Sequence, residues 1–245
     1  MIADPLHARL LEVSALAGGP LLALDTSGAS AAVCTVAWRS GEVRERELGA
    51  AALPSESLSR VLAEEVESCG LEVRQLAAIV IGLGPGSFTG LRVGLATAKG
   101  LALGSGVPLY GTSSLAMLAA SAGPGRVVPV IEARRGEVFA AIYDVQADGG
   151  VTAILDDAAT TPAALVATLH ERAFDYEVKL TGNAALSCAV LGLPPGALVG
   201  PNTSLRAALG VLHVAERLRR HEAEELGPLA PRYLKLSEAE RGQTR

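Results

Sequence analysis

The sequence predicts an α/β protein built from a pair of related subdomains with mixed sheets, and not from one doubly wound sheet. Aromatic residues make up only 3% of the 245 residues, so the core must consist of Ala, Leu and Val. That composition suits alternating strands and helices. Each half of the chain opens with antiparallel strands and continues into helix-strand alternation. The cluster Gly123-Pro124-Gly125 separates the two halves.

These signals divide the chain into four segments. Residues 1–19 form an N-terminal extension or a short helix, and residues 20–122 form the first subdomain. Residues 123–236 form a second, reduced subdomain, whose last helix we expect to pack back on the first. Residues 237–245 are a polar tail, and we expect the preceding Arg232-Tyr233-Leu234-Lys235 to dock onto the folded chain.

Hydrophobic patterning gives the elements of the first half. Apolar or alternating runs predict strands at residues 21–24, 31–38, 42–48, 77–81 and 107–110. Helical spacing predicts helices from Ser55, as an N-cap, to Gly70, from about Phe88 to Leu103, and over 113–120.

The second half repeats the opening hairpin. Strands are predicted at 127–131 and 138–145 around a turn at Ala133-Arg134-Arg135-Gly136, and another at 178–180. Pro162 favours a helix start, which predicts a helix to about His170. A last helix is predicted from a cap at Asn202-Thr203-Ser204 to about Arg220.

Charge and cysteine usage restrict the function classes. The formal net charge is −5, and a protein that grips nucleic acid alone usually has a basic footprint. Any role with RNA is therefore expected to be indirect. Cys34, Cys69 and Cys188 are scattered and odd in number, which predicts free thiols and neither a disulfide framework nor a zinc site. With no signal-peptide pattern and no run long enough to span a bilayer, we expect a cytoplasmic protein with no membrane partner.

The most unusual segment is GPGSFTGLRVG at residues 84–94. It matches neither G-x-x-x-x-G-K-[ST] nor G-x-G-x-x-G, although a helix N-terminus after a glycine turn can still bind an anion. Small residues line one face of the following helix, with Arg92 and Lys99 on another face. That stripe predicts close packing against another backbone, and its members recur at every fourth position: Gly86, Gly90, Gly94, Ala98 and Ala102.

Two hairpin turns carry polar residues. Asp25-Thr26-Ser27 follows the first predicted strand. These side chains could bind phosphate or hydrated Mg²⁺, or they could form an ordinary Asx turn. The Asx turn is favoured. The segment from Glu132 to Glu137, which includes Arg134 and Arg135, could receive an anion or be an exposed, salt-linked turn, and again the turn is favoured.

Several segments in this order resemble the bacterial TsaB family, also called YeaZ. They are LLALDTS, PSESL, IGLGPGSFTGLRVGLATAKGLA, GTSSL and EARRGEVFAAIYD. The resemblance is strong from about Leu21 to Tyr143 and weaker as far as Lys235. It implies an actin-like fold of the sugar kinase and Hsp70 type (ASKHA), in which the two hairpin turns are vestigial phosphate turns.

The resemblance also implies a non-catalytic role. TsaB-like proteins take part in forming N6-threonylcarbamoyladenosine on tRNA, as scaffold or activator of the catalytic subunit TsaD, with the ATPase TsaE joining. The chain has no HxxxH pair for a metal, and it departs from the family at Pro54, where His is common, and at Glu132, where Asp is usual. No metal and no cofactor are expected, and ATP or ADP with Mg²⁺ at a subunit interface is the alternative.

By resemblance, the helices beginning at Ser55 and Phe88 form the surface that docks TsaD or a second copy of the chain. The predicted interface residues are Ser55, Glu56, Leu58, Leu62, Phe88, Gly90, Leu91, Gly94 and Ala98. The predicted vestigial phosphate turns are Asp25, Thr26, Ser27, Glu132, Arg134 and Arg135.

Two enzyme classes remain as alternatives. One is a stand-alone ATPase or small-molecule kinase that uses Asp25 and the hairpin turns. The other is a peptidase, which the lack of HExxH, of a G-x-S-x-G elbow and of a Cys/His pairing disfavours.

Overall fold

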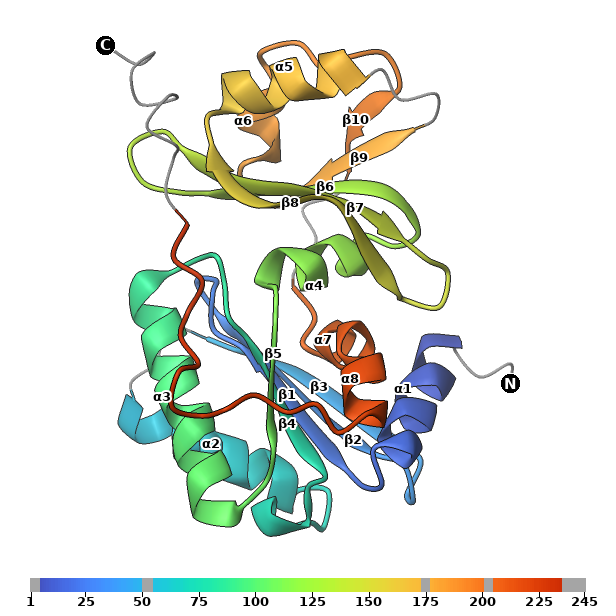
Figure 1. The fold of residues 1–245 in the computed structure, drawn as a ribbon, viewed down its shortest axis with the longest axis vertical. Coiled ribbons are helices and arrows are strands. Elements are labelled where there is room, and N and C mark those ends of the chain that lie inside the picture. The colour runs from blue at the N-terminus through green and yellow to red at the C-terminus, as the bar shows by residue number, and fades with distance from the viewer. Residues whose placement is uncertain (1–4, 50–54, 173–176, 201–204, 235–245) are drawn as a thin grey trace. The chain divides into compact units, whose positions relative to one another are not determined.

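The structure is a computed structural model that describes residues 5–49, 55–172, 177–200 and 205–234 (Figure 1). The chain divides into two units: residues 1–117 with 205–232, and residues 118–204 with 233–245. Residues 118–122 thus join the second unit, and 205–232 join the first, whereas the sequence boundaries lay after residues 122 and 236.

The first unit contains a five-stranded mixed sheet in the order β3-β2-β1-β4-β5. Strands β3, β2 and β1 are antiparallel, and β1, β4 and β5 are parallel. The central strands β1 and β4 consist almost entirely of apolar residues, because both faces of the sheet are covered. The edge strand β3 instead carries charged residues. The strands are β1 (Leu21–Asp25), β2 (Ala31–Ala37), β3 (Glu42–Leu48), β4 (Ala78–Gly82) and β5 (Leu109–Thr112).

The second unit repeats this sheet. Its strand order is β8-β7-β6-β9-β10. As in the first sheet, the first three strands in this order pair antiparallel and the last three pair parallel. The repeat confirms the predicted pair of related α/β subdomains with mixed sheets. The strands are β6 (Gly125–Glu132), β7 (Val138–Val145), β8 (Val151–Thr160), β9 (Val178–Thr181) and β10 (Ala197–Val199). Strands β8 and β10 were not predicted from the sequence.

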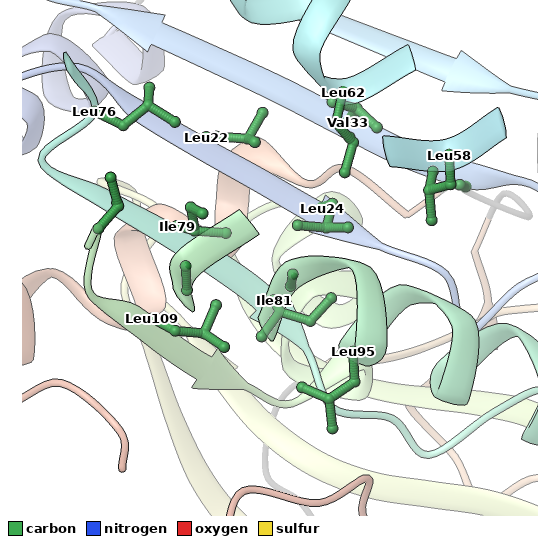
Figure 2. Packing of buried hydrophobic residues seen from close by; sticks show 14 of the residues in the cluster. Leu22, Leu24, Val33, Leu58, Leu62, Leu76, Ile79, Ile81, Leu95 and Leu109 are labelled. Atoms are coloured by element: carbon green, nitrogen blue, oxygen red, sulfur yellow. The ribbon is translucent and has the colours of Figure 1, made fainter. Parts of the chain in front are cut away.

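Helices α2 (Ser55–Glu67) and α3 (Phe88–Ser105) cover one face of the first sheet. Figure 2 shows Leu22 and Leu24 of β1 and Ile79 and Ile81 of β4 in one apolar cluster with side chains of these helices. The cluster takes Leu58 and Leu62 from α2 and Leu95, Ala98 and Ala102 from α3. Short η2 (Val73–Gln75) follows α2, and α4 (Ser114–Ser121) follows β5.

In the second unit, α5 (Pro162–Arg172) and α6 (Ala185–Ala189) pack on the sheet. The core there is again aliphatic, with Val128, Ile142, Leu165, Leu169 and Leu180 among its members.

The end of the chain returns to the first unit. The predicted single helix is broken at Val214 into α7 (Ala208–His213) and α8 (Ala215–Arg219), and its predicted cap at 202–204 lies outside the described residues. Beyond α8, the Glu224 amide donates to the Leu109 carbonyl at 2.8 Å, and the Arg232 amide donates to the Leu83 carbonyl at 2.8 Å. Residues 224–232 therefore pass from the edge of β5 to the end of β4.

Residues 5–16 form helix α1 (Pro5–Leu16), so the segment before the first strand belongs to the folded unit. This helix packs against α7, α8 and the β2–β3 hairpin. Its inner face contributes Leu10 and Val13, each 1% exposed, and Ser14, whose hydroxyl donates to the Gly19 carbonyl at 2.8 Å.

Leu10→Ala is expected to lower the free energy of unfolding by about 2–4 kcal/mol, because it leaves a cavity under α1. Leu16, which is 50% exposed on the same helix, gives the matched control: Leu16→Ala should change stability by less than about 0.5 kcal/mol. Urea denaturation measures both. Equal stabilities for the two variants would show that α1 is not part of the folded core.

No helix among the described residues is both long and apolar enough to cross a lipid bilayer.

Candidate functional site

The turn after β1 lies where the parallel strands β1, β4 and β5 end, the edge at which α/β proteins usually bind ligands. Here the polar side chains of the turn are buried: Asp25 is 2%, Thr26 0% and Ser27 8% exposed. Both oxygens of the Asp25 carboxylate accept hydrogen bonds from within the unit. Oδ1 accepts from the Ser27 amide at 2.7 Å and from its hydroxyl at 2.5 Å, and Oδ2 accepts from the Ser114 hydroxyl at 2.5 Å.

Gly86, just before α3, and Gly90 and Gly94 within α3 pack directly on this turn. A Cβ atom on Gly86 would lie 2.5 Å from the Ser27 carbonyl oxygen, and one on Gly90 would lie 2.1 Å from the Thr26 carbonyl oxygen. On Gly94 it would lie 2.1 Å from Thr26 Oγ1. Two hydrogen bonds hold the contact: Thr26 Oγ1 donates to the Gly90 carbonyl at 2.8 Å, and the Ser87 amide donates to the Ser27 carbonyl at 2.8 Å.

The first turn therefore does not fit a phosphate or a hydrated Mg²⁺ ion. The α3 backbone fills the space above Thr26 and Ser27, and a ligand at Asp25 would have to displace Ser27 or Ser114 from its carboxylate. What remains is a structural role, in which Asp25 fixes the start of α4 to the end of β1. Gly82 is needed for the same reason, since a Cβ there would lie 1.7 Å from Asp25 Oδ2.

Burial raises the pKa of the Asp25 carboxyl, and the hydrogen bonds from Ser114 and Ser27 only partly offset that shift. Because the folded-state pKa exceeds the unfolded one, the folded chain binds this proton more tightly. The contribution of Asp25 to stability is thus fully present below about pH 4, the ordinary carboxyl range, and is lost as the pH rises through the folded-state pKa.

We expect the difference in free energy of unfolding between wild type and Asp25→Asn to be larger at pH 4 than at pH 7, with wild type the more stable. Hydrogen bonds that Asn cannot make cost about the same at both pH values, and the other carboxyls cancel in the comparison, so Asp25 alone sets the slope. Chemical denaturation of both proteins at the two pH values measures it. A difference that stays constant, or grows toward pH 7, would contradict the assignment of Asp25 as a buried carboxyl with a raised pKa.

The second hairpin turn has a more open geometry. The Ala133 amide donates to the Glu137 carbonyl at 3.0 Å, and Arg135 adopts a left-handed φ of 62°. Glu132, Arg134 and Arg135 are exposed, and the Glu132 amide donates to Asn183 Oδ1 at 2.9 Å. This turn lies in the second unit, and its arrangement is that of an exposed hairpin.

Most of the predicted interface residues are buried in the first unit. Leu58, Leu62 and Ala98 are 0% exposed, and Leu91, Gly90 and Gly94 are also buried. Their position corrects the prediction that they form a partner surface, because the stripe meets the chain's own turn and the two leucines fill its own core. The side chains of Ser55 and Glu56 lie outside the described part of the chain. Phe88 is exposed, at 48%.

The structure instead exposes a different set of residues on the same helix. We call Phe88, Arg92, Ala96, Gly100 and Leu103 the outer face of α3. The Arg92 guanidinium lies 5.2 Å from the centroid of the Phe88 ring, and Leu103 is 79% exposed. A Cβ on Gly100 would meet nothing within 4 Å, so the middle of this face is shallow and open.

Other chemistry is sparse in the described residues. Among them, no group of three or more His, Cys, Asp or Glu residues could hold a metal ion. The cysteines are free, as predicted, and burial raises the pKa of the Cys34 thiol, which disfavours a thiolate.

Comparison with known proteins identifies the family. The chain is 31% identical over 186 residues to the tRNA threonylcarbamoyladenosine biosynthesis protein TsaB of Bacillus subtilis, an alignment that covers 71% of this chain and 76% of that protein. The chain belongs to the TsaB family. The E. coli protein of the same name is 38% identical over 138 residues, which cover 53% of this chain and 57% of that protein.

Solved structures agree with this assignment to the TsaB family. YeaZ from Pseudomonas aeruginosa superposes with a TM-score of 0.73 at 25% identity, covering 88% of this chain and 100% of that one. A second structure, described as an uncharacterized protein with similarity to peptidase YEAZ from Pseudomonas aeruginosa, gives a TM-score of 0.74 at 25% identity. It covers 89% of this chain and 100% of its own.

The family model for TsaD, tRNA N6-adenosine threonylcarbamoyltransferase, matches residues 49–241. The chain is therefore related both to TsaB proteins, which are named for threonylcarbamoyladenosine biosynthesis, and to the transferase itself.

Proposed function

We propose that this chain is a non-catalytic subunit of the complex that forms N6-threonylcarbamoyladenosine on tRNA, and that it binds TsaD. Membership of the TsaB family supports the pathway. The observation that carries the non-catalytic role is the closed turn after β1, where both Asp25 oxygens and the space above Thr26 are already occupied. The threonylcarbamoyl transfer then belongs to TsaD, and TsaE joins the assembly.

The outer face of α3 is the docking surface in this proposal. One end of this face carries the exposed Phe88 ring with the Arg92 guanidinium over it, and the other end carries the exposed Leu103. Aromatic and arginine side chains are the usual anchors of protein interfaces. Between them, Ala96 and Gly100 leave room for a second helix to approach the α3 backbone closely.

TsaD is the occupant to which the proposal commits. Because the chain matches the TsaD family model, the two proteins share a fold, and related folds can pack the same helix against each other in a pseudo-symmetric pair. The net charge of −5 supports a tRNA contact that is indirect, through the complex.

Titration of purified TsaD with this chain, followed by calorimetry, tests the partner. A saturable 1:1 complex supports the proposal, whereas a mixture that behaves as two independent proteins would sink it. A complex of two copies of this chain that excludes TsaD would assign the outer face of α3 to self-association.

An ATP hydrolysis assay tests the alternative function, a stand-alone ATPase. The closed turn leads us to expect no ATP turnover by the chain alone in the presence of Mg²⁺. Turnover that Asp25→Ala abolishes would favour the stand-alone enzyme over the subunit.

A further inference from the structure

An exposed aliphatic patch lies at the C-terminal end of α6 in the second unit. Leu186 and Val190 are four positions apart, so they share one helical face, and Leu191 follows directly. They are 69%, 83% and 51% exposed, while Ala185 and Cys188 on the opposite face are buried in the core. We call Leu186, Val190 and Leu191 the α6 patch. Large aliphatic side chains grouped at such exposure mark an interaction surface.

The sequence segment that holds the α6 patch carries no charge. From Thr181 to Leu205 the sequence contains no Asp, Glu, Lys, Arg or His. The exposed neighbours in the described part of this stretch, such as Asn183, Ser187 and Pro195, are neutral. The neighbouring helix α5 adds Glu171 and Arg172, of opposite sign, and His170, whose Nε2 lies 3.0 Å from the Gly192 carbonyl oxygen. Interface cores are depleted in charged residues, and a strongly charged partner would lose its hydration here without gaining an opposite charge.

We infer that the α6 patch binds the same patch of a second copy of this chain. Two copies of this chain carry the same net charge of −5, which opposes their approach at long range. The neutral α6 patch is a place where two copies can meet without bringing like charges together. An aliphatic face is also complementary to itself, as a twofold contact requires.

The neighbouring strand fits the same symmetry. Helix α6 contacts β10, which is the edge strand of the second sheet. The Gly196 carbonyl accepts from Val178 at 2.9 Å and the Gly200 amide donates to Leu180 at 2.8 Å, both toward β9. By strand alternation, the Val199 backbone points away from β9. Identical strands related by a twofold axis are antiparallel, so two Val199 residues can exchange amide-to-carbonyl hydrogen bonds.

The available area makes this a weak dimer. Three aliphatic side chains at these exposures offer roughly 350 Å² per copy, less than half of the ~800 Å² that each partner buries in a standard interface. The dimer therefore forms at high protein concentration. Because the contact is apolar and neutral, high salt does not dissociate it.

Sedimentation velocity at protein concentrations up to about 1 mM tests the inference, since a weak complex is populated there. Every chain carries Leu103→Glu, so that association through α3 is suppressed. Val190→Glu should weaken dimerisation at least about tenfold, because the charge must be desolvated against an aliphatic surface. The neutral Leu186→Ser should weaken it in the same direction.

Ala153→Glu is the matched control, because it adds the same charge at an exposed position on β8, the opposite edge strand of the same sheet. It should leave dimerisation unchanged. Self-association that is equal in the Val190→Glu and Ala153→Glu chains, or a parent chain that stays monomeric throughout, would overturn the inference. Circular dichroism of each variant verifies that the fold is intact.

Discussion

Gly90→Ala is expected to lower the free energy of unfolding by about 3 kcal/mol or more. The added Cβ would lie 2.1 Å from the Thr26 carbonyl oxygen, which is backbone and cannot rotate away. Either α3 or the turn after β1 must move, and the Thr26–Gly90 and Ser87–Ser27 hydrogen bonds would be strained with it. Chemical denaturation of the purified variant measures the loss.

Gly100→Ala on the same helix is the control. A Cβ there meets nothing within 4 Å, and replacing a helical glycine by alanine usually stabilises by about 1 kcal/mol. The two identical substitutions should therefore change stability in opposite directions. If Gly90→Ala were as stable as wild type, the close approach of α3 to Thr26 would be incorrect.

The second large effect concerns the proposed TsaD interface. Phe88→Ala combined with Leu103→Glu should weaken TsaD binding by about 100-fold or more, because one change removes an aromatic anchor and the other places a charge in the contact. Both side chains are well exposed, so the variant should keep the wild-type stability. Calorimetric titration against TsaD measures the affinity.

Val190→Glu is the matched control for that experiment, since it adds the same charge to an equally exposed aliphatic position in the second unit. It should bind TsaD like wild type. Loss of TsaD binding in Val190→Glu, with full binding retained by the double variant, would move the interface from α3 to α6.

The sequence was sufficient for the central elements of the fold. The runs Leu21–Leu24 and Ala77–Ile81 predict strands because they are continuously apolar. They have this pattern because both faces of their sheet are covered. Strand β8 was missed because its apolar and polar residues do not alternate cleanly, and its pairing with β7 contains register shifts. Strand β10 has three residues, too few for any pattern, and nothing at Val214 signals the break between α7 and α8.

The sequence located the candidate site but could not orient it. Small residues occur on two faces of α3, one with Gly90 and Gly94 and the other with Ala96 and Gly100. Spacing alone cannot tell which face meets the chain itself. That choice depends on Thr26, which is 64 positions from Gly90 and meets it only in the folded unit.

The most direct test of the proposed function is a reconstituted assay of threonylcarbamoyladenosine formation on tRNA. It supplies threonylcarbamoyl adenylate as the group donor. It uses TsaD and TsaE with wild-type chain, with the Phe88→Ala/Leu103→Glu variant, and with no added chain. Modification of the tRNA should require the wild-type chain. With the variant altered on the outer face of α3, modification should be no greater than with no added chain. Full modification without this chain, or with the altered one, would contradict a non-catalytic subunit that acts by binding TsaD through α3.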